Sequence, residues 1–209
     1  MELIHIILKG GTLVYILFIL SLIGLSFFLE RYFFLRKFKF NNRVFINKIK
    51  TLILSNKIND SITLCDENPS PVSHVIKSML KKKDLQFQEI KDSIENETQL
   101  QIYQLEKFTG IIRTIAAVSP LIGFLGTVTG MIKTFMAIES NTGQVNPSLL
   151  AGGIWEALVT TAVGLAIGII MLLGYNYIMT HIERFTFEIK QSASELLEIF
   201  LTRGNKENE

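Results

Sequence analysis

The chain has 209 residues, 48% of them hydrophobic and 19% charged, with a formal net charge of +2 and a mean hydropathy of +0.35. This composition is too apolar for an ordinary soluble domain of this length and indicates an integral membrane protein with a substantial water-exposed part. The single cysteine, Cys65, excludes a disulfide framework and a cysteine metal cluster, and the three histidines show no ligand spacing. We therefore expect no cofactor and no metal.

Three uncharged stretches are long enough to span a bilayer, which requires about 20 helical residues. They are Gly10–Leu29, Thr114–Ile132 and Ala157–Ile182. The first is interpreted as a membrane anchor and not as a cleaved signal peptide. Its head is not basic, no Ala-x-Ala site follows it, and a basic cluster lies directly behind it.

Lysine and arginine are distributed unevenly around these stretches. Residues 31–50 contain seven basic residues, whereas residues 139–149 contain none. Basic segments stay on the cytoplasmic side of a membrane, which predicts the topology of the whole chain. We predict an outer N-terminus with the first transmembrane helix over 1–30, a cytoplasmic helical domain over 31–112, the second transmembrane helix over 113–138, a short outer loop over 139–149, the third transmembrane helix over 150–178, and a cytoplasmic amphipathic helix with a polar tail over 179–209.

The predicted fold class is an all-α integral membrane protein with three transmembrane helices and long helices that extend into the cytoplasm. In the cytoplasmic domain, Asn59-Asp60 predicts a turn or a helix cap, and residues 68–71 predict a further break. No Gly or Pro occurs between Leu85 and Gly110, so one helix from Leu85 to Ile138, about 80 Å long, is expected. After the third span, apolar residues recur every three or four positions, as in an amphipathic helix with a partner surface: Ile182, Phe185, Ile189, Ala193, Leu196 and Phe200.

Small and mildly polar residues share one face of the second span. On an ideal helix they lie within about 60° of one another, and they are Ala116, Pro120, Gly123, Thr127, Gly130 and Thr134. Such a face lets helices pack closely in lipid. It is also suited to line a polar path, and both interpretations stay open on the sequence alone.

The third span carries a carboxylate, Glu156, with Thr160 about 40° away on the helix and Gly164 about 40° further round. A carboxyl group at membrane depth is costly and usually faces a water-filled path or a partner. A structural role at the helix N-terminus, where the dipole stabilises an anion, is the alternative. The adjacent hydroxyls favour an ion pathway.

Motifs for nucleotide hydrolysis, zinc proteolysis and serine hydrolysis are missing from the sequence. An intramembrane enzyme would also need a second catalytic group near Glu156, and none lies at a suitable depth. We therefore expect a protein that is not an enzyme and takes its energy from an ion gradient or a partner. A non-conducting membrane scaffold is the competing hypothesis. The Lys81–Lys83 run is interpreted as a solvated helix end, so no nucleic acid partner is expected.

The two membrane motifs, Pro120–Met131 and Gly153–Leu165, resemble those of the MotA/TolQ/ExbB proton channel family. The order of spans and of the cytoplasmic segments is similar as well. Three spans with a compact cytoplasmic domain resemble the ExbB and TolQ members more than MotA, which has four spans. Lys9-Gly-Gly11 before the first span and Glu30-Arg31 after it favour the ExbB type.

This resemblance implies a homopentamer in the bacterial inner membrane, in contact with lipid, around two copies of a single-span partner of the ExbD or TolR type. Proton flow would drive TonB-like or TolA-like proteins that act at the outer membrane, with Tol-Pal envelope maintenance as the alternative role. The family's pore glutamate falls on Glu156 and its hydroxyls on Thr127 and Thr161, with Thr160 as an added polar group. The residues expected to pack along the pore are Pro120, Gly123, Gly130, Thr134 and Gly164. Proton and sodium remain equally compatible with these side chains.

Overall fold

The computed structural model describes residues 11–37, 42–83, 85–140 and 147–207, and these residues form helices and short connections without any strand. The chain divides into two compact units. The first unit comprises residues 1–32 and 108–178, and the second comprises residues 33–107 and 179–209. The all-α fold class is confirmed for the described part of the chain.

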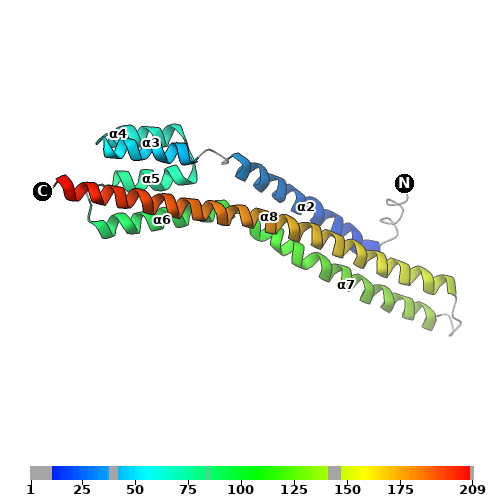
Figure 1. The fold of residues 1–209 in the computed structure, drawn as a ribbon. Helices are drawn as coiled ribbons and strands as arrows, with labels where there is room; N and C mark the ends of the chain where they lie inside the picture. The colour runs from blue at the N-terminus through cyan, green and yellow to red at the C-terminus, as the bar shows by residue number, and fades with distance from the viewer. Residues whose placement is uncertain (1–10, 38–41, 84, 141–146, 208–209) are drawn as a thin grey trace. The chain divides into compact units, whose positions relative to one another are not determined.

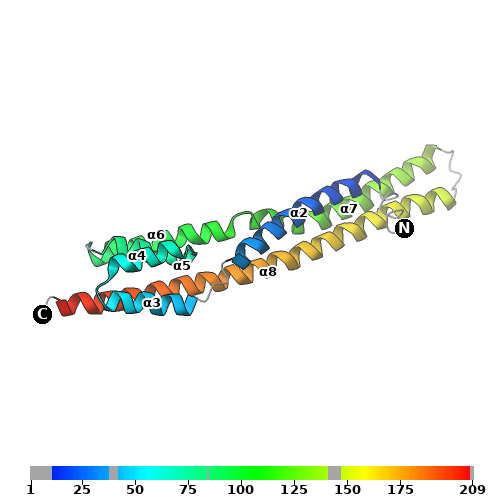
Figure 2. The same ribbon diagram turned by 90° about the horizontal axis from the view of Figure 1, so that it is seen from above.

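The first unit contains three helices that are long and apolar enough to cross a membrane, which confirms the three predicted spans. They are α2 (Gly11–Lys37), α7 (Thr109–Ser140) and the first part of α8 (Pro147–Glu207), and they lie side by side in both views (Figures 1 and 2). Gly24 brings α2 against the other two helices, since a Cβ there would lie 2.8 Å from Met171 Sδ and 3.3 Å from Ile115 Cδ1.

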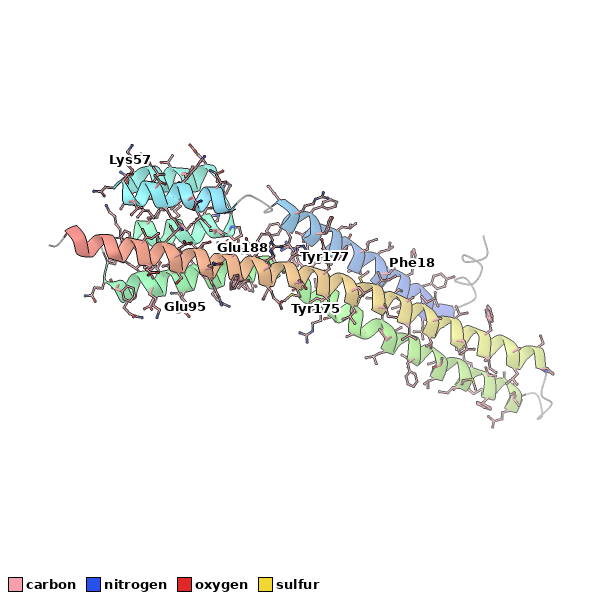
Figure 3. The ribbon with its side chains drawn as sticks, in the orientation of Figure 1. Phe18, Lys57, Glu95, Tyr175, Tyr177 and Glu188 are labelled. Atoms are coloured by element: carbon pink, nitrogen blue, oxygen red, sulfur yellow. The ribbon has the colours of Figure 1, made fainter. Side chains whose placement is uncertain are left out.

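Large apolar side chains project outward from this first unit. Phe18 on α2, half of whose surface is exposed, points away from the helices in Figure 3. Leu121, Phe124 and Leu173 are each exposed by 65%. Exposed apolar side chains on apolar helices of spanning length are expected where lipid or another protein chain covers them. This pattern supports the membrane assignment.

The second unit consists of α3 (Asn42–Leu54), α4 (Ile58–Glu67), α5 (Pro71–Lys81), α6 (Phe87–Glu106) and the last part of α8. The amphipathic pattern predicted after the third span is confirmed, because its central residues are buried. Apolar side chains of all five helices form the core of this unit: Phe45, Ile49, Ile53, Cys65, Val72, Val75, Ile76, Met79, Leu80, Ile90, Leu105, Ile182, Ile189, Ala193 and Leu196.

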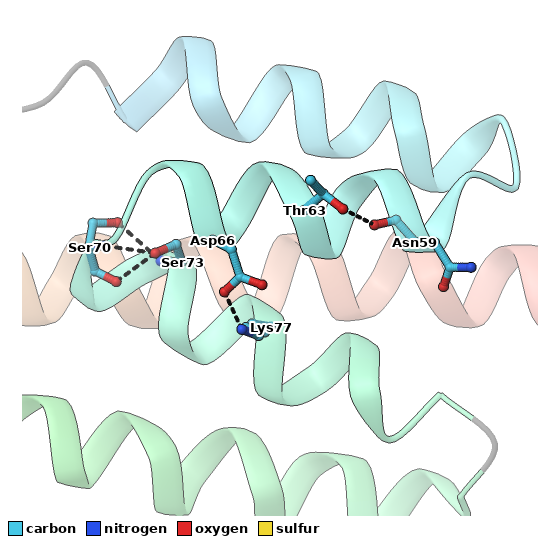
Figure 4. A network of polar contacts seen from close by, with 6 residues as sticks. All are labelled: Asn59, Thr63, Asp66, Ser70, Ser73 and Lys77. Carbon is cyan, nitrogen blue, oxygen red and sulfur yellow. Dashed lines mark hydrogen bonds and ion pairs between the residues drawn. The ribbon is translucent and has the colours of Figure 1, made fainter.

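Local hydrogen bonds fix the turn between α4 and α5, as Figure 4 shows. Ser70 and Ser73 form a reciprocal capping box at the start of α5, and Lys77 pairs with Asp66. The predicted break at 68–71 is therefore confirmed. The turn between α3 and α4 lies at residues 55–57, where Asn56 has φ of 61°, and not at Asn59-Asp60, which belong to the first turn of α4.

The thiol of Cys65 is buried in this core, with 3% of the residue exposed. Burial, reinforced by the neighbouring charge of Asp66, raises the pKa of Cys65 to about 12. A thiol with so high a pKa is protonated at physiological pH and reacts slowly.

The continuous helix predicted from Leu85 to Ile138 is wrong, because α6 and α7 are separated at Lys107–Phe108. Phe108 has φ of 68°, which an aromatic residue rarely adopts. Its ring lies 5.3 Å from the ring of Phe27 and 5.4 Å from the guanidinium carbon of Arg31, which is itself buried. Packing against α2 therefore offsets the backbone cost of the break, a cost of about 1–2 kcal/mol.

We expect Phe108→Gly to destabilise the protein less than Phe108→Ala, by about 1 kcal/mol in the free energy of unfolding. Both changes remove the ring contacts, but only glycine adopts a positive φ without strain. Unfolding of the two variants by denaturing detergent in mixed micelles measures the difference. Equal stability of the two would contradict a left-handed conformation at residue 108.

Candidate functional site

The backbones of α7 and α8 approach each other closely at Gly123 and Gly164. A Cβ added at Gly164 would lie 2.6 Å from Ser119 O and 2.8 Å from Gly123 Cα. A Cβ added at Gly123 would lie 3.1 Å from Thr161 Cα. Backbone therefore meets backbone, which only small residues permit. We call this contact between α7 and α8 the glycine seam.

The glycine seam continues on both sides of this pair. A Cβ at Gly168 would lie 2.6 Å from Pro120 Cγ, and one at Gly130 would lie 2.9 Å from Ala157 Cβ. Further along, Thr134 packs against Gly153. Of the residues predicted to pack along a pore, Gly123, Gly130, Thr134 and Gly164 are buried in the seam, and Pro120 is half-buried at its edge. They pack within one chain, and their role toward a pore stays a prediction.

The three predicted hydroxyls have different hydrogen-bond acceptors. Thr161 Oγ1 donates to Gly123 O at 2.7 Å, across the seam to the other helix. Thr160 Oγ1 donates to Glu156 O at 2.8 Å within α8 and is buried beside Gly126. Thr127 Oγ1 donates to Phe124 O at 2.6 Å within α7. Thr161 thus joins the helices, whereas Thr160 and Thr127 bond to the backbone of their own helix.

Glu156 lies near the start of α8, which begins at Pro147, and its side chain is half-buried. Within the described part of the chain, no hydrogen bond joins its side chain to Thr127 or Thr161. The end of its side chain lies instead against Gly11, the first residue of α2. The structure therefore brings together a carboxylate, the seam and the start of a third helix.

Sequence reasoning assigned no role to Gly11 beyond the Lys9-Gly-Gly11 resemblance. The contact joins residues 11 and 156, which lie on different helices. A helical wheel describes one helix at a time and therefore cannot predict it. The one available signal was a glycine at the start of an apolar span. Lys9 itself lies outside the described residues.

The remaining ionisable residues of α7 do not reach the seam. Arg113, Lys133 and Glu139 are all exposed, and the two cations lie near the two ends of the span, as expected. Among the described residues, no group of histidine, cysteine, aspartate or glutamate side chains has the arrangement of a metal site. Among the described residues of α7 and of α8 up to residue 178, the ionisable side chain beside the seam is thus Glu156.

We expect Gly164→Ala to reduce the free energy of unfolding by about 1–3 kcal/mol, as overpacking does elsewhere. The new methyl group would meet backbone atoms of α7 that cannot move independently. Gly152→Ala, also on α8, is the matched control because nothing lies within 4 Å of a Cβ there. Unfolding in mixed micelles compares the two, and equal stability would argue against the seam.

We expect Thr161→Val to cost about 0.6 kcal/mol, and at most about 1.7 kcal/mol, which is the range for hydrogen bonds between membrane helices. Thr127→Val is the control, and its effect should be close to zero, because the Thr127 hydroxyl bonds only within its own helix. The same unfolding measurement tests both. A loss in Thr161→Val no greater than that in Thr127→Val would show that the interhelical bond contributes nothing measurable.

Comparison with known proteins gives consistent matches. A biopolymer transport ExbB homologue from Methanothermobacter thermautotrophicus is 29% identical over 84% of this chain and 62% of its own length. An ExbB-like biopolymer transport protein from Synechocystis is 29% identical over 81% of each chain. The Tol-Pal system protein TolQ of Haemophilus influenzae is 30% identical over 65% of this chain and 52% of its own. Residues 67–191 match the MotA/TolQ/ExbB proton channel family, and the chain belongs to that family.

Proposed function

We propose that this chain is the ion-channel subunit of an inner-membrane complex that uses the proton motive force to energise TonB-dependent transport across the outer membrane. The observation that carries the proposal is a carboxylate, Glu156, on a membrane-spanning helix beside the glycine seam. The membership of the chain in a proton channel family supports the proposal that an ion is transported across the membrane. Two of its similar proteins are named for ExbB-type biopolymer transport.

In this proposal Glu156 binds and releases the ion. Retaining a carboxyl group at membrane depth is costly, so a functional requirement is the simplest reason for it. Thr161 and Thr127 supply hydroxyls along the path, and Thr160 adds a polar group beside Glu156. Each elementary charge that crosses a potential of 100 mV supplies about 2.3 kcal/mol, so several ions per cycle suffice for a substantial conformational step.

The protein works, in this proposal, as part of an assembly. The copies form a homopentamer in the inner membrane, with an ExbD-like single-span partner inside it and a TonB-like protein receiving the work. Many apolar side chains on the outer faces of α2, α7 and α8 are exposed, which suits contact with lipid and with neighbouring subunits. The N-terminus and residues 139–149 face the periplasm, and residues 31–112 and 179–209 lie in the cytoplasm, as the basic residues indicate.

A TolQ-like role in envelope maintenance is the second candidate. It is favoured by the 30% identity to a protein named for the Tol-Pal system. The two roles share Glu156 and the seam, and they differ in the protein that receives the work. A non-conducting scaffold is the third candidate, since the seam glycines and the Thr161 bond serve packing within the chain.

We expect Glu156→Gln to abolish gradient-driven uptake while the protein still assembles. Glutamine has nearly the shape of glutamate but cannot carry a proton. The variant is co-expressed with its single-span partner, and uptake is measured with and without an uncoupler beside the oligomer size. Glu139→Gln, at the exposed end of α7, is the matched control and should retain uptake.

Wild-type uptake together with wild-type envelope integrity in Glu156→Gln at equal abundance would overturn the ion-channel proposal and favour the scaffold. Loss of envelope integrity without loss of uptake would instead favour the TolQ-like role.

A further inference from the structure

We propose that Gly11 is a positioning residue for the Glu156 carboxyl group, because the missing side chain at this position lets the start of α2 close over that carboxyl. The inference rests on the proposed function, in which Glu156 binds the ion, and it adds a residue from a helix that carries none of the predicted site residues. The first span thereby takes part in the site and is more than a membrane anchor.

The geometry at Gly11 leaves no room for a side chain. A Cβ there would overlap Glu156 Oε1 and would lie 3.0 Å from Cδ and 3.5 Å from Cγ of the same side chain. The three nearest atoms thus all belong to Glu156. The backbone at Gly11 also has φ of 68°, a conformation that favours glycine. Two independent features, the space and the backbone conformation, therefore select glycine at this position.

The contact is made by the end of the Glu156 side chain and not by its stem. The carboxyl end of a glutamate can rotate away, so a methyl group at residue 11 would displace the carboxyl group without separating the helices. By contrast, the glycines of the seam face backbone atoms, and substitution there disturbs helix packing. Gly11 therefore governs where the carboxyl group lies, whereas Gly123 and Gly164 govern how closely α7 and α8 approach.

The position of the carboxyl group matters because, in the proposed function, the ion must reach Glu156 from one side of the membrane and leave it toward the other. With α2 against it, Glu156 Oε1 is covered by backbone, and the side chain is half-buried. Without that cover, the carboxyl group would sample more rotamers and become accessible to reagents from the membrane. In this way α2 restricts the carboxyl group of Glu156 to one orientation.

The test measures the rate at which dicyclohexylcarbodiimide modifies the Glu156 carboxyl group. The reaction is carried out in membranes of cells that express the chain with its single-span partner. Mass spectrometry of the peptide that contains residue 156 measures the extent of modification. We expect Gly11→Ala to raise this rate several-fold. Gly152→Ala, one turn before Glu156 on α8 with no atom within 4 Å of the added methyl group, should leave the rate unchanged. A rate in Gly11→Ala that is unchanged or reduced overturns the proposal.

A double-mutant cycle separates the contact from the backbone conformation. Glu156→Asp shortens the side chain by one methylene group and leaves room for a methyl group at residue 11. If the contact governs the effect, Gly11→Ala raises the rate of carbodiimide labelling at residue 156 much less in the Glu156→Asp variant than in the wild-type chain. Equal rises in the two backgrounds would assign the whole effect to the positive φ and overturn the proposal.

The two proposals fail in different ways. Unchanged carbodiimide labelling together with an inactive Glu156→Gln variant would remove Gly11 from the site and keep the ion channel. Faster labelling together with an active Glu156→Gln variant would retain the contact and remove the ion channel.

Discussion

The close approach of α7 and α8 is the constraint on which the rest of the membrane-spanning unit depends. Within lipid there is little hydrophobic drive between helices, so their association rests on packing and interhelical hydrogen bonds. At Gly123 and Gly164 the two backbones lie so close that a methyl group on either residue would press against the other helix. This close approach allows the Thr161 hydroxyl to donate to a main-chain carbonyl of α7. A Cβ at Gly164 would lie 2.6 Å from Ser119 O and one at Gly123 would lie 3.1 Å from Thr161 Cα, so a larger residue at either position would disturb this contact.

The placement of Glu156 follows from the same seam. Because α8 is held against α7 through Ala157 and Gly153, the neighbouring Glu156 is placed to one side, where α2 begins. The seam thus occupies one face of α8 and leaves the carboxyl group for a different neighbour. One helix thus presents its small residues to α7 and its carboxyl group to α2, on different faces.

Sequence reasoning succeeded where one helix could be considered alone. The three spans were predictable from uninterrupted apolar residues, and the buried face of Ile182, Ile189 and Leu196 was predictable from its spacing. The break at Phe108 was not predictable, since no Gly or Pro marks it and its partners lie on α2, far away in the sequence. The contact of Gly11 with Glu156 and the bond of Thr161 to Gly123 were missed for the same reason: each depends on how two helices pack.

The burial of Cys65 has a consequence for the chemistry of the whole chain. Its thiol is the only one in the sequence, and at neutral pH it is almost entirely in the unreactive protonated form. Thiol reagents therefore modify the folded protein very slowly. A cysteine introduced on an exposed surface would be the dominant nucleophile of its kind, and modification of Cys65 itself would report that the helical core around it had opened.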